Sequence, residues 1–405
     1  MVHIEIRNKE FAMISISTTG AKSVLSGALF GAALTAAGVY SPTVIISQMK
    51  LESFHMLKVF LSASATSAAI FLLAHRLSPS IAPPRQPSSL SLFPYDGNLI
   101  GGLLLGTGMA LTGACPGTVL PQVVTGYSSG RYAFLGGILG GIIYSFIRPF
   151  IRSPSTHPIV PDSKPTLYQK LDPKADEIKA VYIYQNFCWG IILLASWLSN
   201  SQKQSLLSAT WGGIGIGCAQ GASLWLTGNT LGTSAAYEQI GDLFWWGVGK
   251  LKGGDIISSE KVYENGNANG VSKRQSQHKS RPSIRSNLFT IGILLGAYII
   301  SHTFTLPSSL PSSLPKVSLD APAIPEISII HALLGGIAMV LGARIAGGCT
   351  SGHGISGMSL LSVSSIISVG AMFGAVYYGA LLLDDGVCEG ELSRKDLKSR
   401  VEETL

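Results

Sequence analysis

The chain contains few charged residues for its length. Asp, Glu, Lys and Arg make up 13% of its 405 residues and hydrophobic residues make up 46%, whereas charged residues are about 25% of an ordinary globular protein. This shortage excludes an ordinary soluble enzyme and indicates that lipid surrounds much of the chain. Four stretches contain no charged residue, and each is long enough for a membrane span of about 20 residues: 23–49, 97–130, 204–237 and 345–383.

Motifs for several catalytic functions are also missing. The chain has no Gly-x-x-x-x-Gly-Lys-Ser/Thr sequence, so ATP-driven transport by this chain alone is not expected. It has no His-x-x-x-His pair, and its five cysteines include no Cys-x-x-Cys, so neither a metalloprotease nor a zinc ribbon is expected. We therefore predict no catalytic residue, no metal and no cofactor, and we interpret the cysteines as reduced thiols.

The net charge of +7 comes from basic residues that lie mainly in loops. Eight of them separate two apolar stretches, as the positive-inside rule predicts for a cytoplasmic loop: Lys250, Lys252, Lys261, Lys273, Arg274, Lys279, Arg281 and Arg285. We therefore expect a lipid bilayer, and no nucleic acid, to be the partner of this surface.

Glycines recur in one pattern along the chain. Spacings of four and then seven residues occur three times, and a fourth copy keeps the outer pair with Val340 between: Gly27, Gly31, Gly38; Gly102, Gly106, Gly113; Gly217, Gly221, Gly228; Gly336, Gly347. Two glycines four residues apart lie on one face of a helix and allow another helix to approach closely in lipid. We predict four repeated segments, which make up two pseudo-symmetric halves.

The last glycine of each copy is predicted to end a helix: Gly38, Gly113, Gly228 and Gly347. The sequences that follow, such as Gly-Ala-Cys-Pro-Gly and Gly-Gly-Cys-Thr-Ser-Gly-His-Gly, cannot continue a regular helix. Broken backbone at membrane depth must be buried in protein or line a wet cavity. Each copy is therefore predicted to be a short helix, a break or re-entrant segment, and a further helix, in an all-α polytopic membrane protein.

The chain divides into segments of different composition. We predict an N-terminal segment 1–22, a first membrane half 23–151, a loop 152–180, a second membrane half 181–383 and a charged tail 384–405. Within the second half we expect a disordered basic loop at 251–286 and a Pro-rich linker at 303–326. A further Pro- and Ser-rich loop is expected at 77–97. Longer helices are predicted at 54–76, 130–151, 181–199, 236–250, 287–306 and 358–383.

The slot two residues after each breaking glycine holds a polar or sulfur-containing residue: Tyr40, Cys115, Thr230 and Cys349. Helix breaks leave backbone amides free inside the membrane, and such amides suit an anion. A thiol can donate its S–H to a soft sulfur acceptor or exchange with a sulfane sulfur. Cys115 and Cys349 are therefore predicted to lie on one substrate path.

Arg344 is a charge in an otherwise apolar stretch, directly before the last break. Three roles are open to it: it could attract the anion, pair with Glu238 or Asp242, or brace a helix end. Cys218 is out of register with the other two path cysteines, so core and path roles both remain open for it. Cys188 is expected in the core or facing lipid.

Four motifs in the chain resemble those of the YeeE/YedE sulphur-transport family: GVYSPTVIISQMKL at 38–51, TGMALTGACPGTVLPQ at 107–122, GCAQGASLWLTGNTLG at 217–232 and GARIAGGCTSGHGISGMS at 342–359. The resemblance covers most of the chain and implies an all-helical protein with two similar halves and an hourglass interior. It also implies thiosulfate uptake along conserved cysteines. Cys115 and Cys349 match the family's cysteine motifs, whereas Tyr40 occupies the slot of a further path cysteine in bacterial members.

In a relay of this kind, thiosulfate would pass between thiols through S–H hydrogen bonds without becoming covalently attached. Thr350, Ser351 and His353 are candidates to hydrogen-bond the anion. We therefore predict uptake of thiosulfate or a related inorganic sulfur anion by a multi-pass protein of the plasma membrane, with a cytosolic sulfur acceptor as a possible partner. The alternatives are a membrane-embedded sulfurtransferase that forms a cysteine persulfide and a pore for another small anion.

Overall fold

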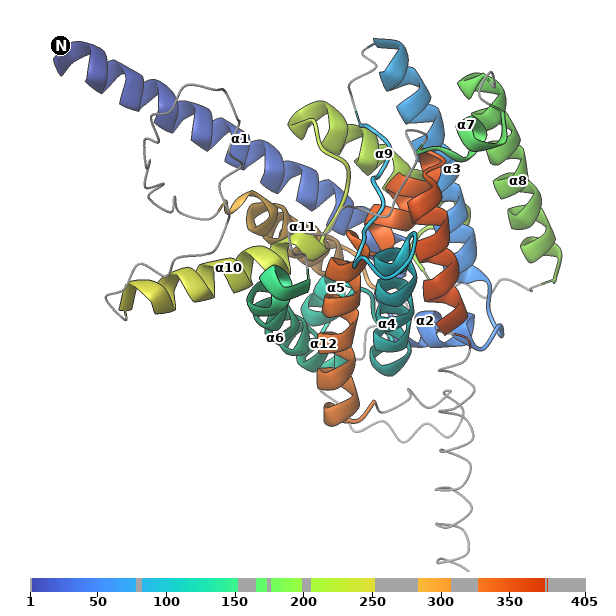
Figure 1. The fold of residues 1–405 in the computed structure, drawn as a ribbon. Helices are drawn as coiled ribbons and strands as arrows, with labels where there is room; N and C mark the ends of the chain where they lie inside the picture. The colour runs from blue at the N-terminus through green and yellow to red at the C-terminus, as the bar shows by residue number, and fades with distance from the viewer. Residues whose placement is uncertain are drawn as a thin grey trace, which may run out of the picture.

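The computed structural model describes residues 2–77, 82–151, 165–172, 176–198, 205–251, 283–306, 327–375 and 377. These residues form helices and connecting loops, with no β-strand among them (Figure 1). The predicted all-α class is therefore confirmed.

Twelve α-helices and one π-helical segment are named in this part of the chain. In order they are α1 (Val2–Ala36), α2 (Pro42–Met49), α3 (His55–Leu77), α4 (Asp96–Thr112), α5 (Val119–Val124), α6 (Ser128–Ile151), α7 (Leu167–Leu171), α8 (Glu177–Leu198), α9 (Ala209–Thr227), α10 (Ser234–Leu251), α11 (Arg285–Thr303), α12 (Ile329–Ala346) and η1 (Ser351–Gly357). An apolar helix Val363–Ala375 follows η1.

Five helices, α3, α6, α8, α11 and α12, are long and apolar enough to cross a membrane. Large apolar side chains are exposed on several of them, as on α8, where Ile183, Phe187 and Leu193 all face outward. An exposed apolar surface of this kind is expected where lipid, not water, is the solvent. The chain is therefore described below as an integral membrane protein.

The long helices lie close to their predicted positions, with differences at their ends. The structure begins α8 at Glu177 and forms the short helix α7, although both positions fall in the segment 152–180 that was predicted as a loop. Helix α1 likewise extends through the predicted N-terminal segment 1–22. The tail 384–405 and most of the segments 251–286 and 303–326 lie outside the described residues, and the predicted helix 358–383 is described only as far as 377. The division of the chain into two membrane halves stays a prediction.

Four helix ends coincide with the predicted breaks. Gly38, Gly113, Gly228 and Gly347 have φ angles of 74°, 58°, 68° and 85°. This left-handed conformation is easily reached only by glycine, which explains why glycine ends each helix at these positions. Gly113, Gly228 and Gly347 directly follow α4, α9 and α12.

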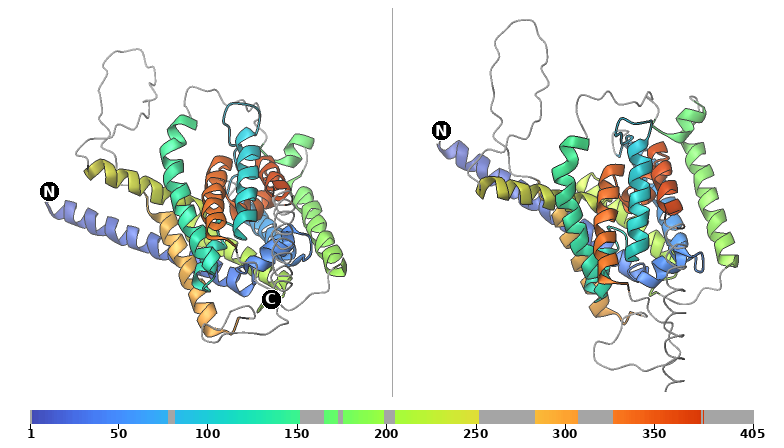
Figure 2. Two further views of the ribbon diagram at one scale, coloured as in Figure 1. Left: turned by 90° about the horizontal axis from the view of Figure 1, so that it is seen from below. Right: turned by 60° about the horizontal axis from the view of Figure 1, so that its bottom comes forward.

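Helices α4 and α12 pack closely through glycine. Gly101 of α4 lies against Gly342 and Ala346 of α12, while Gly108 lies against Gly335 and Met339. Residue numbers thus rise on one helix as they fall on the other, so the two helices are antiparallel neighbours (Figure 2). Because Gly113 ends α4 and Gly347 ends α12, these two breaks lie at opposite ends of the helix pair.

The same kinds of contact recur elsewhere in the helical body. Helices α1 and α9 are antiparallel, with Ala37 against Gly212 and Ala33 near Gly215. Helix α9 also runs parallel to α3, and α12 runs parallel to α6. The first part of α1 projects beyond the other helices, and α8 packs against α3 at the opposite edge (Figure 1). The breaks therefore lie among tightly packed helices.

A methyl group at position 108 should disrupt the α4–α12 contact. Its Cβ atom would lie 2.6 Å from the carbonyl oxygen of Gly335, and overpacking of this kind costs about 1–3 kcal/mol. We expect Gly108→Ala to lower the thermal unfolding midpoint of the detergent-purified protein. The control is Gly190→Ala, since no atom lies within 4 Å of a Cβ there. Equal midpoints for the two variants would contradict this packing.

Candidate functional site

Cys115 lies in the break between α4 and α5, where Thr118 holds its sulfur. Thr118 donates to Cys115 Sγ from its backbone N–H at 3.4 Å and from its hydroxyl at 3.3 Å. The Cys115 N–H in turn donates to Thr118 Oγ1 at 2.8 Å. The side chain of Gln122 donates to the carbonyl of Gly113 at 2.8 Å, which satisfies the end of α4. These contacts fix the Cys115 sulfur in a backbone that has no regular helix around it.

Cys349 lies in the break after α12, and its sulfur also has several hydrogen-bonding neighbours. The hydroxyls of Ser351 and Thr233 lie 3.3 Å and 3.4 Å from Cys349 Sγ. The backbone N–H groups of Gly352 and Ser234 also interact electrostatically with this sulfur. Ser351 and Gly352 belong to the wide turn η1, which is rich in glycine, while Thr233 and Ser234 lie at the start of α10. The break after α12 and the start of α10 thus meet at the Cys349 sulfur.

Thr233 connects the surroundings of the two cysteines. Its hydroxyl oxygen contacts Cys349 Sγ and also lies 3.5 Å from where a Cβ atom of Gly117 would be. That same Cβ position lies 3.9 Å from Cys115 Sγ. Both thiols are buried and belong to one core cluster. The structure therefore brings Cys115 and Cys349 together, with Gly117 and Thr233 between them.

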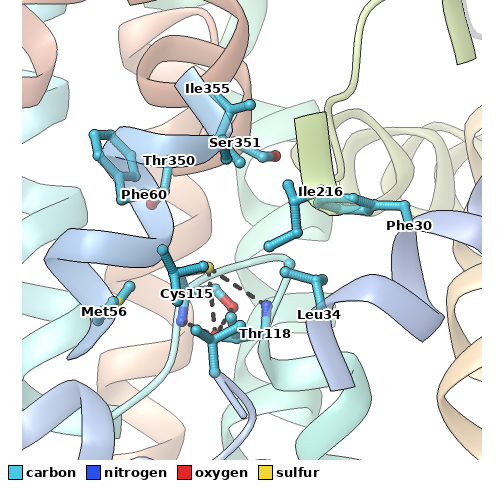
Figure 3. Close-up of a pocket in the computed structure, with 14 residues that line it drawn as sticks. Phe30, Leu34, Met56, Phe60, Cys115, Thr118, Ile216, Thr350, Ser351 and Ile355 are labelled. Atoms are coloured by element: carbon cyan, nitrogen blue, oxygen red, sulfur yellow. Dashed lines mark hydrogen bonds between the residues drawn. The ribbon is translucent and has the colours of Figure 1, made fainter. Parts of the chain in front are cut away.

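A cavity opens in front of Cys115. Figure 3 shows Cys115 and Thr118 on one side and Thr350, Ser351 and Ile355 on the other. Most of the wall is apolar, and the lining residues include Phe30, Leu34, Val39, Met56, Val59, Phe60, Ala63 and Ile216. The polar groups on the wall are thus a thiol and hydroxyls, with no charged side chain among the lining residues.

The whole of this arrangement lies within the part of the chain that a family model matches. The model described as Sulphur transport matches residues 36–378. The chain belongs to the sulphur transport family. The resemblance to the YeeE/YedE proteins is thereby confirmed. A comparison with individually curated proteins gave no match. Together with the five apolar helices, the family identifies this chain as an integral membrane protein of sulfur-anion transport.

Of the other residues predicted on the path of this sulphur transport protein, Thr350 and Ser351 line the cavity. The Thr350 hydroxyl also lies 3.5 Å and 3.4 Å from the sulfurs of Met109 and Met372. His353 is buried beside them, but both of its ring nitrogens have partners. Nδ1 lies 2.9 Å from Ser365 Oγ and Nε2 lies 3.1 Å from the carbonyl of Ala346. His353 therefore holds η1 against its neighbours and does not line the cavity.

The structure does not gather the remaining candidates around the cavity. Tyr40 is buried in a separate cluster with Tyr127 and Leu306. Thr230 lies partly buried in the loop between α9 and α10, and Cys218 is exposed on α9. None of these three lines the cavity, although Val39, the neighbour of Tyr40, does. Within the described residues, no group of three or more His, Cys, Asp or Glu side chains could hold a metal ion.

Arg344 forms an ion pair with Glu238, one of the three roles left open by the sequence. The other carboxylate oxygen of Glu238 accepts a hydrogen bond of 2.6 Å from Arg148, which also lies 3.4 Å from Asp242. Arg344 Nη1 lies 3.5 Å from Ser234 Oγ, next to the residues that contact Cys349. This ion-pair network therefore ties α6, α10 and α12 together beside the Cys349 sulfur.

Three residues at the site are not among those predicted from the sequence: Thr118, Thr233 and Arg85. Thr118 lies in the predicted break, three residues after Cys115, so its spacing was a usable signal. Thr233 was not predicted, because Thr230 is the residue that lies two positions after the breaking glycine in the third copy, as the cysteines do in theirs. Arg85 lies in the predicted loop 77–97 and donates to the carbonyl of Gly347 at 3.2 Å. No local pattern connects Arg85 with a glycine 262 residues away.

Removing the shared carboxylate should loosen the start of α10. We expect Glu238→Gln to lower stability by up to about 3 kcal/mol, because it leaves Arg344 without its ion-pair partner in a water-poor site. Thermal unfolding in detergent measures this change. The matched control is Arg148→Gln, which should have a smaller effect because the Arg148 side chain is 42% exposed. The double variant Glu238→Gln/Arg344→Gln should recover part of the loss. A pure uptake defect with unchanged stability would instead favour an anion-attracting role for Arg344.

Proposed function

We propose that this protein takes up thiosulfate or a related inorganic sulfur anion along a path past Cys115 and Cys349. The observation that carries the proposal is the short series of contacts from Cys115 through Gly117 and Thr233 to Cys349. It gives a soft anion two thiols in succession inside the membrane. Membership of the sulphur transport family supports the general class of substrate.

The chemistry of the two breaks suits an anion that is itself soft. Each thiol can donate S–H to a terminal sulfur, which is a weak interaction and therefore easily released to the next thiol. Hydroxyls and backbone N–H groups around each sulfur can donate hydrogen bonds to the anion. The anion stays intact, and no bond to the protein is formed.

The path also requires access from both sides of the membrane. Gly113 and Gly347 end α4 and α12 at opposite ends of an antiparallel pair. We propose that the four breaks belong to four repeated segments in two pseudo-symmetric halves around an hourglass path. The recurring left-handed glycines and the two antiparallel pairs, α1 with α9 and α4 with α12, support this arrangement. Residence in the plasma membrane and delivery to a cytosolic sulfur acceptor belong to the same proposal.

Replacing either path thiol should stop uptake. We expect Cys115→Ser and Cys349→Ser each to reduce uptake of labelled thiosulfate by about tenfold or more, since the hard hydroxyl of serine replaces the soft thiol that matches the anion's terminal sulfur. The assay uses cells without another sulfur source, with the protein quantified in the membrane. The matched control is Cys218→Ser, because Cys218 is exposed on α9 away from the cavity. Near-normal uptake by Cys349→Ser would contradict the proposal and favour a pore in which the thiols are incidental.

Mass spectrometry of the protein after exposure to thiosulfate distinguishes carriage from sulfur transfer. In a sulfurtransferase, a cysteine thiolate attacks the outer sulfur of thiosulfate, a persulfide forms and sulfite leaves. We expect Cys115 and Cys349 to carry no added sulfur atom, because the anion passes through whole. A stable persulfide on either residue, with sulfite released in equal amount, would instead identify an enzyme.

A further inference from the structure

Arg85 places a cation against the break that contains Cys349. Its Nη1 donates to the carbonyl of Gly347 at 3.2 Å. A Cβ atom at Gly348 would lie 3.0 Å from Nη1, and one at Gly352 would lie 2.9 Å from Nη2. The guanidinium therefore occupies space that exists because residues 348 and 352 have no side chains. These glycines flank Cys349 in the sequence, one residue before it and three after.

Among the residues that the structure describes, no nearby carboxylate balances the charge of Arg85. No Asp or Glu of the described chain lies within 4.0 Å of it, and Glu238 is already engaged by Arg148 and Arg344. The groups that interact with it electrostatically are the Cys349 sulfur, Arg344 and His353. A guanidinium has five N–H donors, and one of them is used by the Gly347 carbonyl. The remaining donors and the charge are available to an anion.

The loop that carries Arg85 is held in place before any anion arrives. The backbone carbonyl of Arg85 accepts hydrogen bonds from the hydroxyls of Ser362 and Ser364, at 2.8 Å and 2.9 Å. Three residues later, Ser88 donates from its backbone N–H to Asn98 Oδ1 at 2.8 Å and from its hydroxyl to the Ile345 carbonyl at 2.5 Å. A donor fixed in this way loses little conformational freedom on binding, which favours recognition over a flexible surface charge.

We propose that Arg85 binds the oxygen atoms of the transported anion, beside Cys349, whose thiol receives the anion's terminal sulfur. The inference rests on the proposed function and narrows its substrate class. An oxyanion end suits a guanidinium, which binds oxygen atoms in pairs, while a terminal sulfur suits a thiol. The transported anion must then carry both oxygen atoms and a terminal sulfur, as thiosulfate does. Sulfate lacks the terminal sulfur, and hydrosulfide lacks the oxygens.

A purely structural role for Arg85 makes a different prediction. A cation at the C-terminus of a helix stabilises its last carbonyl groups, and Arg285 makes a contact of this kind by donating to the Thr227 carbonyl at 2.5 Å at the end of α9. Arg285 is therefore the matched control. If Arg85 only capped α12, Arg85→Gln and Arg285→Gln would have similar effects on stability and neither would change how anions reach Cys349.

Transport kinetics give the first test. In proteoliposomes, we expect Arg85→Gln to raise the KM for thiosulfate by about tenfold or more, with Arg85→Lys between it and the wild type because lysine keeps the charge but not the paired donors. Arg285→Gln should leave the KM within about twofold, as for a residue that only caps a helix. An unchanged KM for a folded Arg85→Gln protein would overturn the proposal.

Charged thiol reagents give a second readout that does not depend on transport. In a protein whose only cysteine is Cys349, with serine at 115, 188, 218 and 388, we compare the reaction rates of an anionic and a cationic methanethiosulfonate of similar size. We expect Arg85→Gln to lower the ratio of anionic to cationic rates by about tenfold, because a cation raises the local concentration of anions. Arg285→Gln should leave the ratio unchanged.

The outcomes separate this site from the proposed function. Suppose that Arg85→Gln lowers the ratio of anionic to cationic reaction rates and that Cys349→Ser takes up thiosulfate normally. These results together would support Arg85 as an anion site and contradict the path along the cysteines. Two results would overturn the Arg85 site itself. One is a ratio of reaction rates that Arg85→Gln leaves unchanged. The other is that neither reagent reacts with Cys349 in the single-cysteine protein that keeps Arg85. Arg85→Lys provides the folded comparison if Arg85→Gln fails to reach the membrane.

Discussion

A helix that breaks inside a bilayer must give every freed backbone group a partner within the protein, because lipid offers none. The four breaks meet this requirement in a similar way. Each ends on a glycine in the left-handed region, and a polar side chain then reaches a nearby carbonyl group. His55 reaches Ala37, Gln122 reaches Gly113, Ser223 reaches Asn229 and Arg85 reaches Gly347. Because these partners are present, the irregular backbone that carries the two cysteines can be buried in the protein.

The same constraint explains which parts of the fold could be predicted from the sequence. Glycine is the residue that adopts a left-handed conformation without strain, so its spacing located the ends of α1, α4, α9 and α12. Apolar length located the longer helices. Helix α7 and the true start of α8 were missed, because the charged residues around Glu177 indicated a loop. Glu177 instead hydrogen-bonds to His75 in the last turn of α3, a contact from a distant part of the chain.

The candidate site was predictable only where its residues follow a break in the chain. Cys115 and Cys349 each lie two residues after a breaking glycine, and both belong to the same core cluster. Tyr40 and Cys218 were also candidates for the path. In the structure, however, Tyr40 packs in a separate cluster and Cys218 is exposed on α9. Thr233 and Arg85 contact the last break from distant parts of the chain. Contacts of that kind depend on helix packing, which a repeat pattern does not specify.

The position of the Arg85 guanidinium against Gly348 and Gly352 also has an evolutionary consequence. A Cβ atom at position 352 would lie 2.9 Å from Nη2, and one at 348 would lie 3.0 Å from Nη1. Loss of either glycine would therefore shift the guanidinium within the break. Among diverging descendants of this chain, the glycines at 348 and 352 should be retained while position 85 is arginine and become free to vary once it is not. The three positions should thus covary, although 262 residues separate Arg85 from Gly347, whose carbonyl it binds.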